Sequence, residues 1–118
     1  MLHRMQCDIV RSAGETILRL LAEMQDEDEL FASGATLHAV EAQLLVMSQT
    51  LAHFSPALRQ RLHRIDWQSW GQLHQLLESG GQPRREAVWY GVRALVPATL
   101  ELVAELRKRE PHWFEIDY

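Results

Sequence analysis

The sequence contains a single cysteine and no apolar run long enough to cross a membrane, and each lack excludes a class of protein. Cys7 alone cannot form an internal disulfide, so nothing points to an oxidising compartment. The apolar stretches fall short of the roughly 18 residues that a membrane helix requires. The first four residues, Met1-Leu2-His3-Arg4, lack the core of a signal peptide. We therefore expect a cytoplasmic protein with no membrane span.

Motifs for metals, phosphates and covalent catalysis are missing as well. No two of the six histidines are three or four residues apart, which is the spacing that places two ligands on one helix face. His38 and Glu41 have that spacing, but two ligands do not make a metal site. The sequence contains no glycine-rich phosphate loop, nucleophile elbow or C-x-x-C pair. It therefore predicts no metal site and no cofactor.

Composition and charge indicate one globular domain. The chain has 118 residues, of which 47% are hydrophobic and 24% are charged, as in ordinary single-domain proteins. A net charge of −4 argues against a surface that binds nucleic acid on all sides.

Acidic residues cluster at 26–29, and arginines flank the middle of the chain: Arg59, Arg61, Arg64, Arg84 and Arg85. These arginines either line a surface for RNA or an acidic partner, or form a solvated face.

Apolar residues recur at steps of three and four, which predicts helices throughout the chain. The first helix is expected at about 2–25 and the second at about 35–53, with the acidic segment between them. Gly14 lies inside the first helix, where glycine is unfavourable, so we expect it to mark a close contact with another helix. No segment alternates as a strand would.

Capping residues divide the second half of the chain. Ser55-Pro56 predicts the start of a short helix at about 56–63, because serine accepts from free N–H groups and proline tolerates the first turn. Asp66 is expected to cap the next helix, which ends near residue 78 before a Gly-Gly-Gln-Pro stop.

The last helix is expected at about 84–109 and contains Pro97. Proline lacks an N–H group, so it leaves one carbonyl unpaired and predicts a kink. Four longer helices and one short helix predict an all-α fold, an antiparallel helical bundle.

One segment also carries a family resemblance. In order, it contains Ser55-Pro56-Ala57-Leu58, Ile65-Asp66-Trp67, Glu86-Ala87-Val88-Trp89 and Leu95-Val96-Pro97. This order and spacing resembles the HepT-like branch of the HEPN superfamily, small all-helical proteins that include RNase toxins paired with nucleotidyltransferase antitoxins. The resemblance covers about residues 4–110. It implies a HepT-like domain at 1–110, a C-terminal tail at 111–118 and a homodimer.

The catalytic signature of that family is Arg, four to six residues, then His, often with Tyr two residues later. Laid on this sequence, the three positions fall on His74, Ser79 and Gly81, and no arginine lies between Trp67 and Pro83. Serine does not titrate near neutral pH, and histidine is a poor replacement for a permanent guanidinium charge. The resemblance thus implies a degenerate ribonuclease without catalytic residues. His74 is interpreted as an exposed partner of Glu78 or an interface histidine.

A formal match to the signature lies elsewhere, between Arg107 and His112. Pro111 disfavours helix at the residue before it, so the two side chains are not expected to share one helix face. Beyond that proline, the tail is rich in aromatic groups that require cover. We expect the aromatic residues to pack in a homodimer or over the bundle, or in the groove of a partner: Trp67, Trp70, Trp113 and Phe114.

Three functions remain open from the sequence. The first is a HepT-like component of a toxin–antitoxin-like system that is catalytically degenerate and acts by dimerisation and binding of a nucleotidyltransferase. The second is an active metal-independent RNase toxin with a site rebuilt around His74 or the Arg59–Arg64 cluster. The third is an unrelated helical adaptor. RNA is a weaker partner candidate than protein, since the formal charge is negative.

Overall fold

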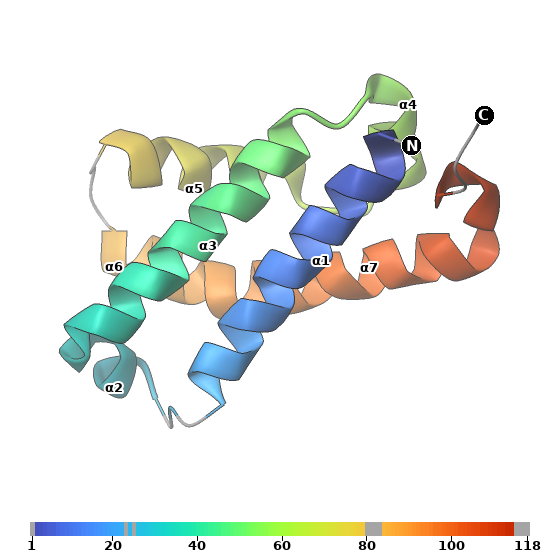
Figure 1. The fold of residues 1–118 in the computed structure, drawn as a ribbon. Coiled ribbons are helices and arrows are strands. Elements are labelled where there is room, and N and C mark those ends of the chain that lie inside the picture. The colour runs from blue at the N-terminus through green and yellow to red at the C-terminus, as the bar shows by residue number, and fades with distance from the viewer. Residues whose placement is uncertain (1, 23, 25, 80–83, 115–118) are drawn as a thin grey trace.

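The computed structural model describes residues 2–22, 24, 26–79 and 84–114, and its regular structure is helical throughout these residues (Figure 1). The longer helices are α1 (Leu2–Leu21), α3 (Gly34–Ala52) and α5 (Trp67–Ser79). A further long helix is continuous from α6 (Arg84–Tyr90) through the π-helical turn η1 (Gly91–Leu95) into α7 (Val96–Arg109). The prediction of an all-α bundle is confirmed, with bounds within a few residues of those expected.

The short helices occupy the connections. They are α2 (Glu27–Ala32), α4 (Pro56–Arg61) and the 3₁₀ turn η2 (Pro111–Phe114). The acidic segment separates the first two long helices, as expected, and it also forms a short helix, α2, that was not predicted. Asp26 caps α2 by accepting from the Glu29 N–H at 2.9 Å, and acidic groups in the first turn complement the helix dipole.

The predicted caps of α4 and α5 are confirmed. The Ser55 hydroxyl accepts from the Leu58 N–H at 3.1 Å, and Pro56 is the first residue of α4. The Asp66 carboxylate accepts from the Ser69 N–H at 3.1 Å. These two caps fix the starts of α4 and α5, the helices that carry Arg59 and Trp67.

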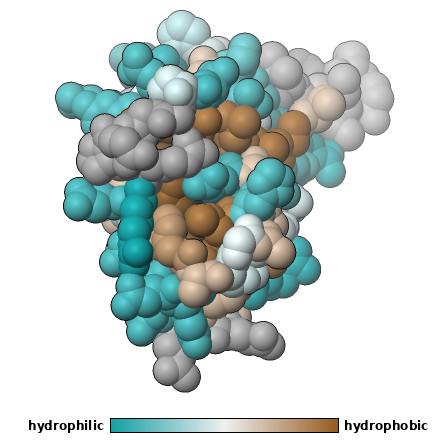
Figure 2. Space-filling view, turned by 90° about the vertical axis from the view of Figure 1, so that its left-hand side faces the viewer, coloured by the Kyte–Doolittle hydropathy of each residue, from teal (hydrophilic) through white to brown (hydrophobic). Residues whose placement is uncertain are grey.

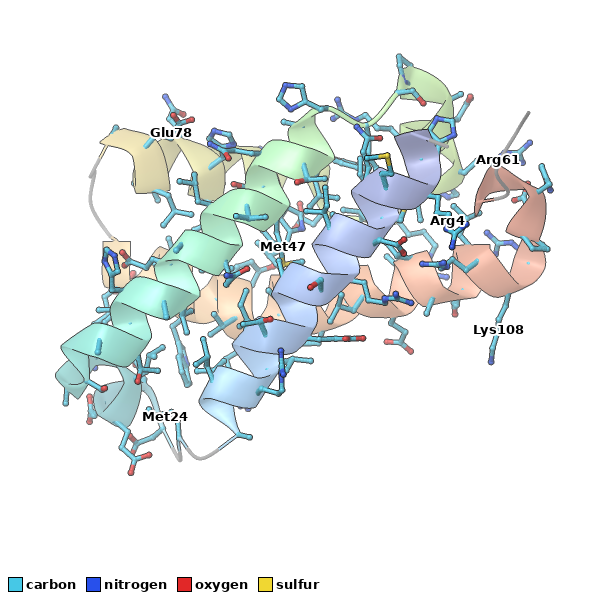
Figure 3. The ribbon with its side chains drawn as sticks, in the orientation of Figure 1. Arg4, Met24, Met47, Arg61, Glu78 and Lys108 are labelled. Carbon is cyan, nitrogen blue, oxygen red and sulfur yellow. The ribbon has the colours of Figure 1, made fainter. Side chains whose placement is uncertain are left out.

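The molecule has two layers, with α1 and α3 side by side in front of α5 and the α6–α7 helix (Figure 1). The core fills the space between them, and Met47 of α3 lies near its centre (Figure 3). The largest fully buried side chains come from most of the helices: Val10, Ile17, Leu30, Val40, Leu44, Met47, Leu51, Leu58, Val88, Val92, Val96 and Leu106.

Gly14 marks a close helix contact, as its position predicts. A Cβ atom at Gly14 would lie 2.7 Å from Leu100 Cδ2, so the absence of a side chain lets α1 approach α7. Gly91 has the same role in η1, because a Cβ atom there would lie 2.9 Å from Leu73 Cδ2 of α5.

Pro97 is accommodated by the π-helical turn that ends two residues before it. Proline cannot donate to the carbonyl four residues earlier, and a wider turn is one of the ways in which a helix absorbs that loss. The helix continues to Arg109 without a break.

By length and composition alone, the stretch Arg85–Arg109 is the one helix among the described residues that reaches the threshold for crossing a membrane. Its apolar face is buried inside the bundle through Val88, Val92, Val96, Val103 and Leu106. Core helices of folded domains reach the same threshold, so this helix is weak support for a membrane span.

Candidate arginine–histidine site

A cavity of about 180 Å³ lies where α4 meets α3 and α5. Its chemistry comes from Arg59 of α4 and His74 of α5, which are 15 positions apart in the sequence. Ser48 and Ala52 of α3 and Trp67 and Trp70 of α5 form much of the remaining wall. The structure thus brings His74 and one residue of the arginine cluster to a single cavity.

The Arg59 guanidinium stacks on the Trp67 ring, with its carbon 4.5 Å from the ring centre. The ring itself is fixed: its Nε1–H donates to the Leu62 carbonyl at 3.1 Å, and Phe54 packs edge-on with ring centres 6.0 Å apart. Among the described residues, no carboxylate lies within ion-pair distance of Arg59, and its side chain is exposed. Arg59 is therefore a positioned cation that remains available to an external anion.

His74 lies half-buried on α5 and pairs with the Glu78 carboxylate one turn later. This confirms the interpretation of His74 as the partner of Glu78. Ser79 is the exposed last residue of α5. Along α5 there is no arginine, so a family-type Arg/His pair does not form on this helix.

The other clustered arginines do not face the cavity. Arg61 lies 3.6 Å from Glu110, and Arg64 lies 4.0 Å from Glu105, so both point toward the end of α7. Figure 3 shows Arg61 and Glu78 at opposite ends of the molecule. Arg61 and Arg64 therefore do not share the cavity wall with Arg59.

Arg85 lies at the far end of the bundle, where it bridges the acidic segment. Its guanidinium donates to Glu27 at 3.1 Å and contacts Asp28, and these hydrogen bonds raise the pKa of a group that is already fully charged. The side chain of Arg84 lies outside the described residues. Arg85 is thus committed to holding α2 against α6.

The aromatic residues expected at an interface have different roles. Trp70 is 2% exposed, and its Nε1–H donates to the Thr99 hydroxyl at 3.0 Å, so it belongs to the core of the bundle. Trp67 is half-buried as the platform for Arg59. The side chains of Trp113 and Phe114 lie outside the described residues.

The second match to the family signature is split by the fold, as expected. Arg107 belongs to α7 and donates to Asp8 of α1 at 2.7 Å, whereas His112 lies in η2, beyond the end of that helix. The two side chains do not share a helix face.

A second cavity, of about 360 Å³, lies between α5 and the α6–η1 segment. Its wall is largely apolar, with Leu73, Leu76 and Leu95, and Figure 2 shows the apolar surface at this end of the molecule. Glu86 and Tyr90 are the ionisable groups in its wall, and they offer no cation for an anionic ligand. In the described part of the chain, no group of three potential metal ligands comes together.

Comparison of the chain with models of protein families, with curated proteins and with solved structures finds no match.

We did not predict from the sequence that Arg59 and His74 line the same cavity, because we considered them as alternative centres of a rebuilt site. Two sequence features could have indicated this arrangement. Asp66 caps the first turn of α5, and Trp67 follows it as an aromatic ring on which an arginine of α4 can stack. Which of the three clustered arginines would use that platform depends on the tertiary position of α7, which supplies carboxylates to the other two.

Proposed function

We propose that the chain is a HepT-like HEPN-fold component of a toxin–antitoxin-like pair, present in the cytoplasm as a homodimer. In this role it has lost ribonuclease chemistry and acts by binding a nucleotidyltransferase partner. The order of residues 55–103 supports the family, and the helical bundle is compatible with it.

The observation that carries the proposal is the state of α5. At the family's arginine position, His74 is paired with Glu78, and at the family's histidine position Ser79 offers no titratable group. A ribonuclease of this kind needs a base for the 2′-hydroxyl and a cation for the developing phosphorane charge. α5 supplies neither in the family's arrangement, which favours a binding function over catalysis.

Arg59 is the proposed contact with the partner. It is exposed, stacked in a fixed position and without a carboxylate partner among the described residues, so binding an acidic group requires no ion pair to break. Arg64 gives a matched contrast, because it is also exposed but lies beside Glu105 of α7.

Co-expression with the product of the neighbouring gene tests the proposal. We expect the two proteins to co-purify and the Arg59→Glu variant to lose most of the complex. Arg64→Glu makes the same change in net charge and is expected to retain it. If no complex forms with the unmodified chain, or if both variants weaken it equally, the partner proposal fails and the helical adaptor function takes its place.

A rebuilt ribonuclease is a second candidate, because Arg59 and His74 line the same cavity. In such a site, His74 would accept the 2′-hydroxyl proton and Arg59 would stabilise the charge on phosphorus. Under the leading proposal, purified protein cleaves RNA no faster than background without metal. Cleavage that disappears in both His74→Ala and Arg59→Ala would replace the leading proposal with this one.

A further inference from the structure

The cavity between α5 and the α6–η1 segment has a volume of about 360 Å³ and a wall that is mostly apolar. Leu73 and Leu95 are buried in this wall, and Leu76 is half-buried there. Figure 2 shows apolar side chains at the surface on this side of the molecule. Ligand-binding cavities usually have about 300–1,000 Å³, apolar walls and a few polar groups that orient the ligand. The volume and the wall therefore suit a small ligand with an apolar body.

The π-helical turn η1 builds one side of this cavity. Tyr90 directly precedes η1 and Leu95 ends it, and both side chains line the cavity. In an α-helix, residues five positions apart lie on different faces, whereas the i→i+5 pattern of a π-turn brings them to the same face. The turn thus places an aromatic ring and an aliphatic side chain in one wall. π-turns are frequent at functional sites.

The charge at the rim of the cavity is negative. Glu86 and Tyr90 are one turn apart on one face of α6, and both are exposed, so they lie where the cavity meets solvent. Arg85, which precedes Glu86 in the chain, is turned toward Glu27 and Asp28 of α2. Among the residues that the structure describes, no cation lies within ion-pair distance of Glu86. The rim therefore presents a carboxylate beside an aromatic ring.

The surrounding end of the molecule is acidic as well. The acidic segment at 26–29, the start of α6 and the end of α5 lie on the same side of the molecule (Figure 1), and Glu78 lies there too (Figure 3). Clefts near charge of one sign concentrate ions of the opposite sign. The cavity therefore favours a cation, whereas an anionic ligand would be repelled by the rim and by the surface around it.

We propose that this cavity binds a hydrophobic amine, a small molecule with an apolar body and one ammonium group. The apolar body lies against Leu73, Leu76 and Leu95, where it gains by leaving water. The ammonium group lies beside Glu86 and Tyr90, because a carboxylate pairs with a cation and the face of a tyrosine ring attracts one. The proposal does not rest on the proposed function, since the two cavities share no lining residue.

Three probes with the same alkyl chain test the proposal: octylamine, octanol and octanoate. At neutral pH, we expect octylamine to bind about tenfold more tightly than octanol, because its charge adds an ion pair and a cation–π contact at an exposed site. Octanoate should bind more weakly than either. Replacing octylamine by hexylamine should weaken binding about fourfold for each methylene group removed from the cavity. Shifts in the NMR signals of Leu73, Ala87 and Leu95 during titration locate the bound chain.

Glu86→Gln keeps the shape of the side chain and removes its charge. It should lower the affinity for octylamine by about fivefold and leave the affinity for octanol unchanged. Glu101→Gln, at an exposed position of α7 outside the cavity, removes the same charge and is the matched control, with both affinities unchanged. Ala87→Leu enlarges a side chain in the cavity wall and should abolish binding of all the probes, with a native circular dichroism spectrum. If this variant does not fold, the comparison of the two glutamate variants decides.

Equal affinities for octylamine and octanol would overturn the proposal, as would a loss of octylamine binding that is the same in Glu86→Gln and Glu101→Gln. Absence of binding at about 10 mM, the weakest affinity expected for a probe of this size, would overturn it too. Sedimentation of the same samples tests whether another chain fills the cavity. If octylamine binds only as a dimer of the chain dissociates, the occupant of the cavity is a second copy, and the proposal fails.

Discussion

At the scale of single residues, the same residue type has different roles according to what lies opposite it. Arg59, Arg61 and Arg64 fall within six positions of one another, and composition gives no reason to separate them. In the fold, Glu110 and Glu105 of the last helix face two of them, and Trp67 supports the third. The sequence shows the cluster but not which of its arginines have carboxylate partners, because Glu110 and Glu105 are more than 40 residues away from Arg61 and Arg64.

Cys7 is a free cysteine whose side chain is fully buried in the core. Burial raises the pKa of its thiol to about 12, because the charged thiolate is poorly solvated inside the core. The thiolate is the reactive form, so the native protein should not react with a disulfide reagent at pH 8. We expect rapid labelling of one thiol per chain only in urea.

Reaction of native Cys7 at the rate of a free thiol would contradict its burial.

The raised pKa of the Cys7 thiol also affects stability. Since the pKa in the folded state is raised, the contribution of Cys7 to folding is fully present below the pKa of the unfolded thiol, near 9, and is lost as the pH rises toward 12.

At the scale of elements, hydrophobic periodicity and caps were sufficient to predict the long helices. Ser55 and Asp66 make the predicted capping hydrogen bonds. Helix α2 was missed because six residues contain too few apolar positions to show a period, and its single buried residue, Leu30, gains significance only once α3 packs beside it. The π-helical turn was missed for a related reason: Pro97 signals an irregularity, but packing decides its form.

Two glycines allow the same substitution to be compared inside helical elements. Gly91→Ala places a Cβ atom 2.9 Å from Leu73, which is buried and has little freedom to move, so we expect a loss of about 1–3 kcal/mol in the free energy of unfolding. Gly71→Ala has nothing within 4 Å of the new Cβ atom. It should therefore stabilise the protein by roughly 0.5–1 kcal/mol through helix propensity.

Urea denaturation followed by circular dichroism measures both changes. If Gly91→Ala is as stable as Gly71→Ala, the close approach of η1 to α5 is wrong.

At the scale of the whole molecule, charge is separated along the longest dimension. The bundle measures 47 × 27 × 22 Å, with the acidic α2 at one end and the arginine-bearing α4 at the other (Figure 1). The sequence shows both clusters but not their separation, which depends on how the helices fold back on one another. The net charge of −4 is therefore not spread evenly along the molecule.

This separation determines how an acidic partner would associate. At very low salt, the net negative charge repels it from a distance, whereas above about 0.1 M the Debye length falls to about 10 Å or less, so that charges near α4 dominate. In that range, the positive charge at Arg59 attracts the partner, and added salt weakens the attraction. We expect the association rate to fall by roughly tenfold between about 0.1 M and 1 M salt, with a smaller change in the dissociation rate.

Stopped-flow measurements with the neighbouring gene product, supplied separately, give both rates. Arg59→Gln should remove most of the salt dependence, because it deletes the one exposed arginine of α4 that has no carboxylate partner among the described residues. Arg19→Gln, near the end of α1, changes the net charge equally and should leave the dependence in place. If the two variants behave alike, association responds to total charge, and the α4 end of the molecule is not where the partner binds.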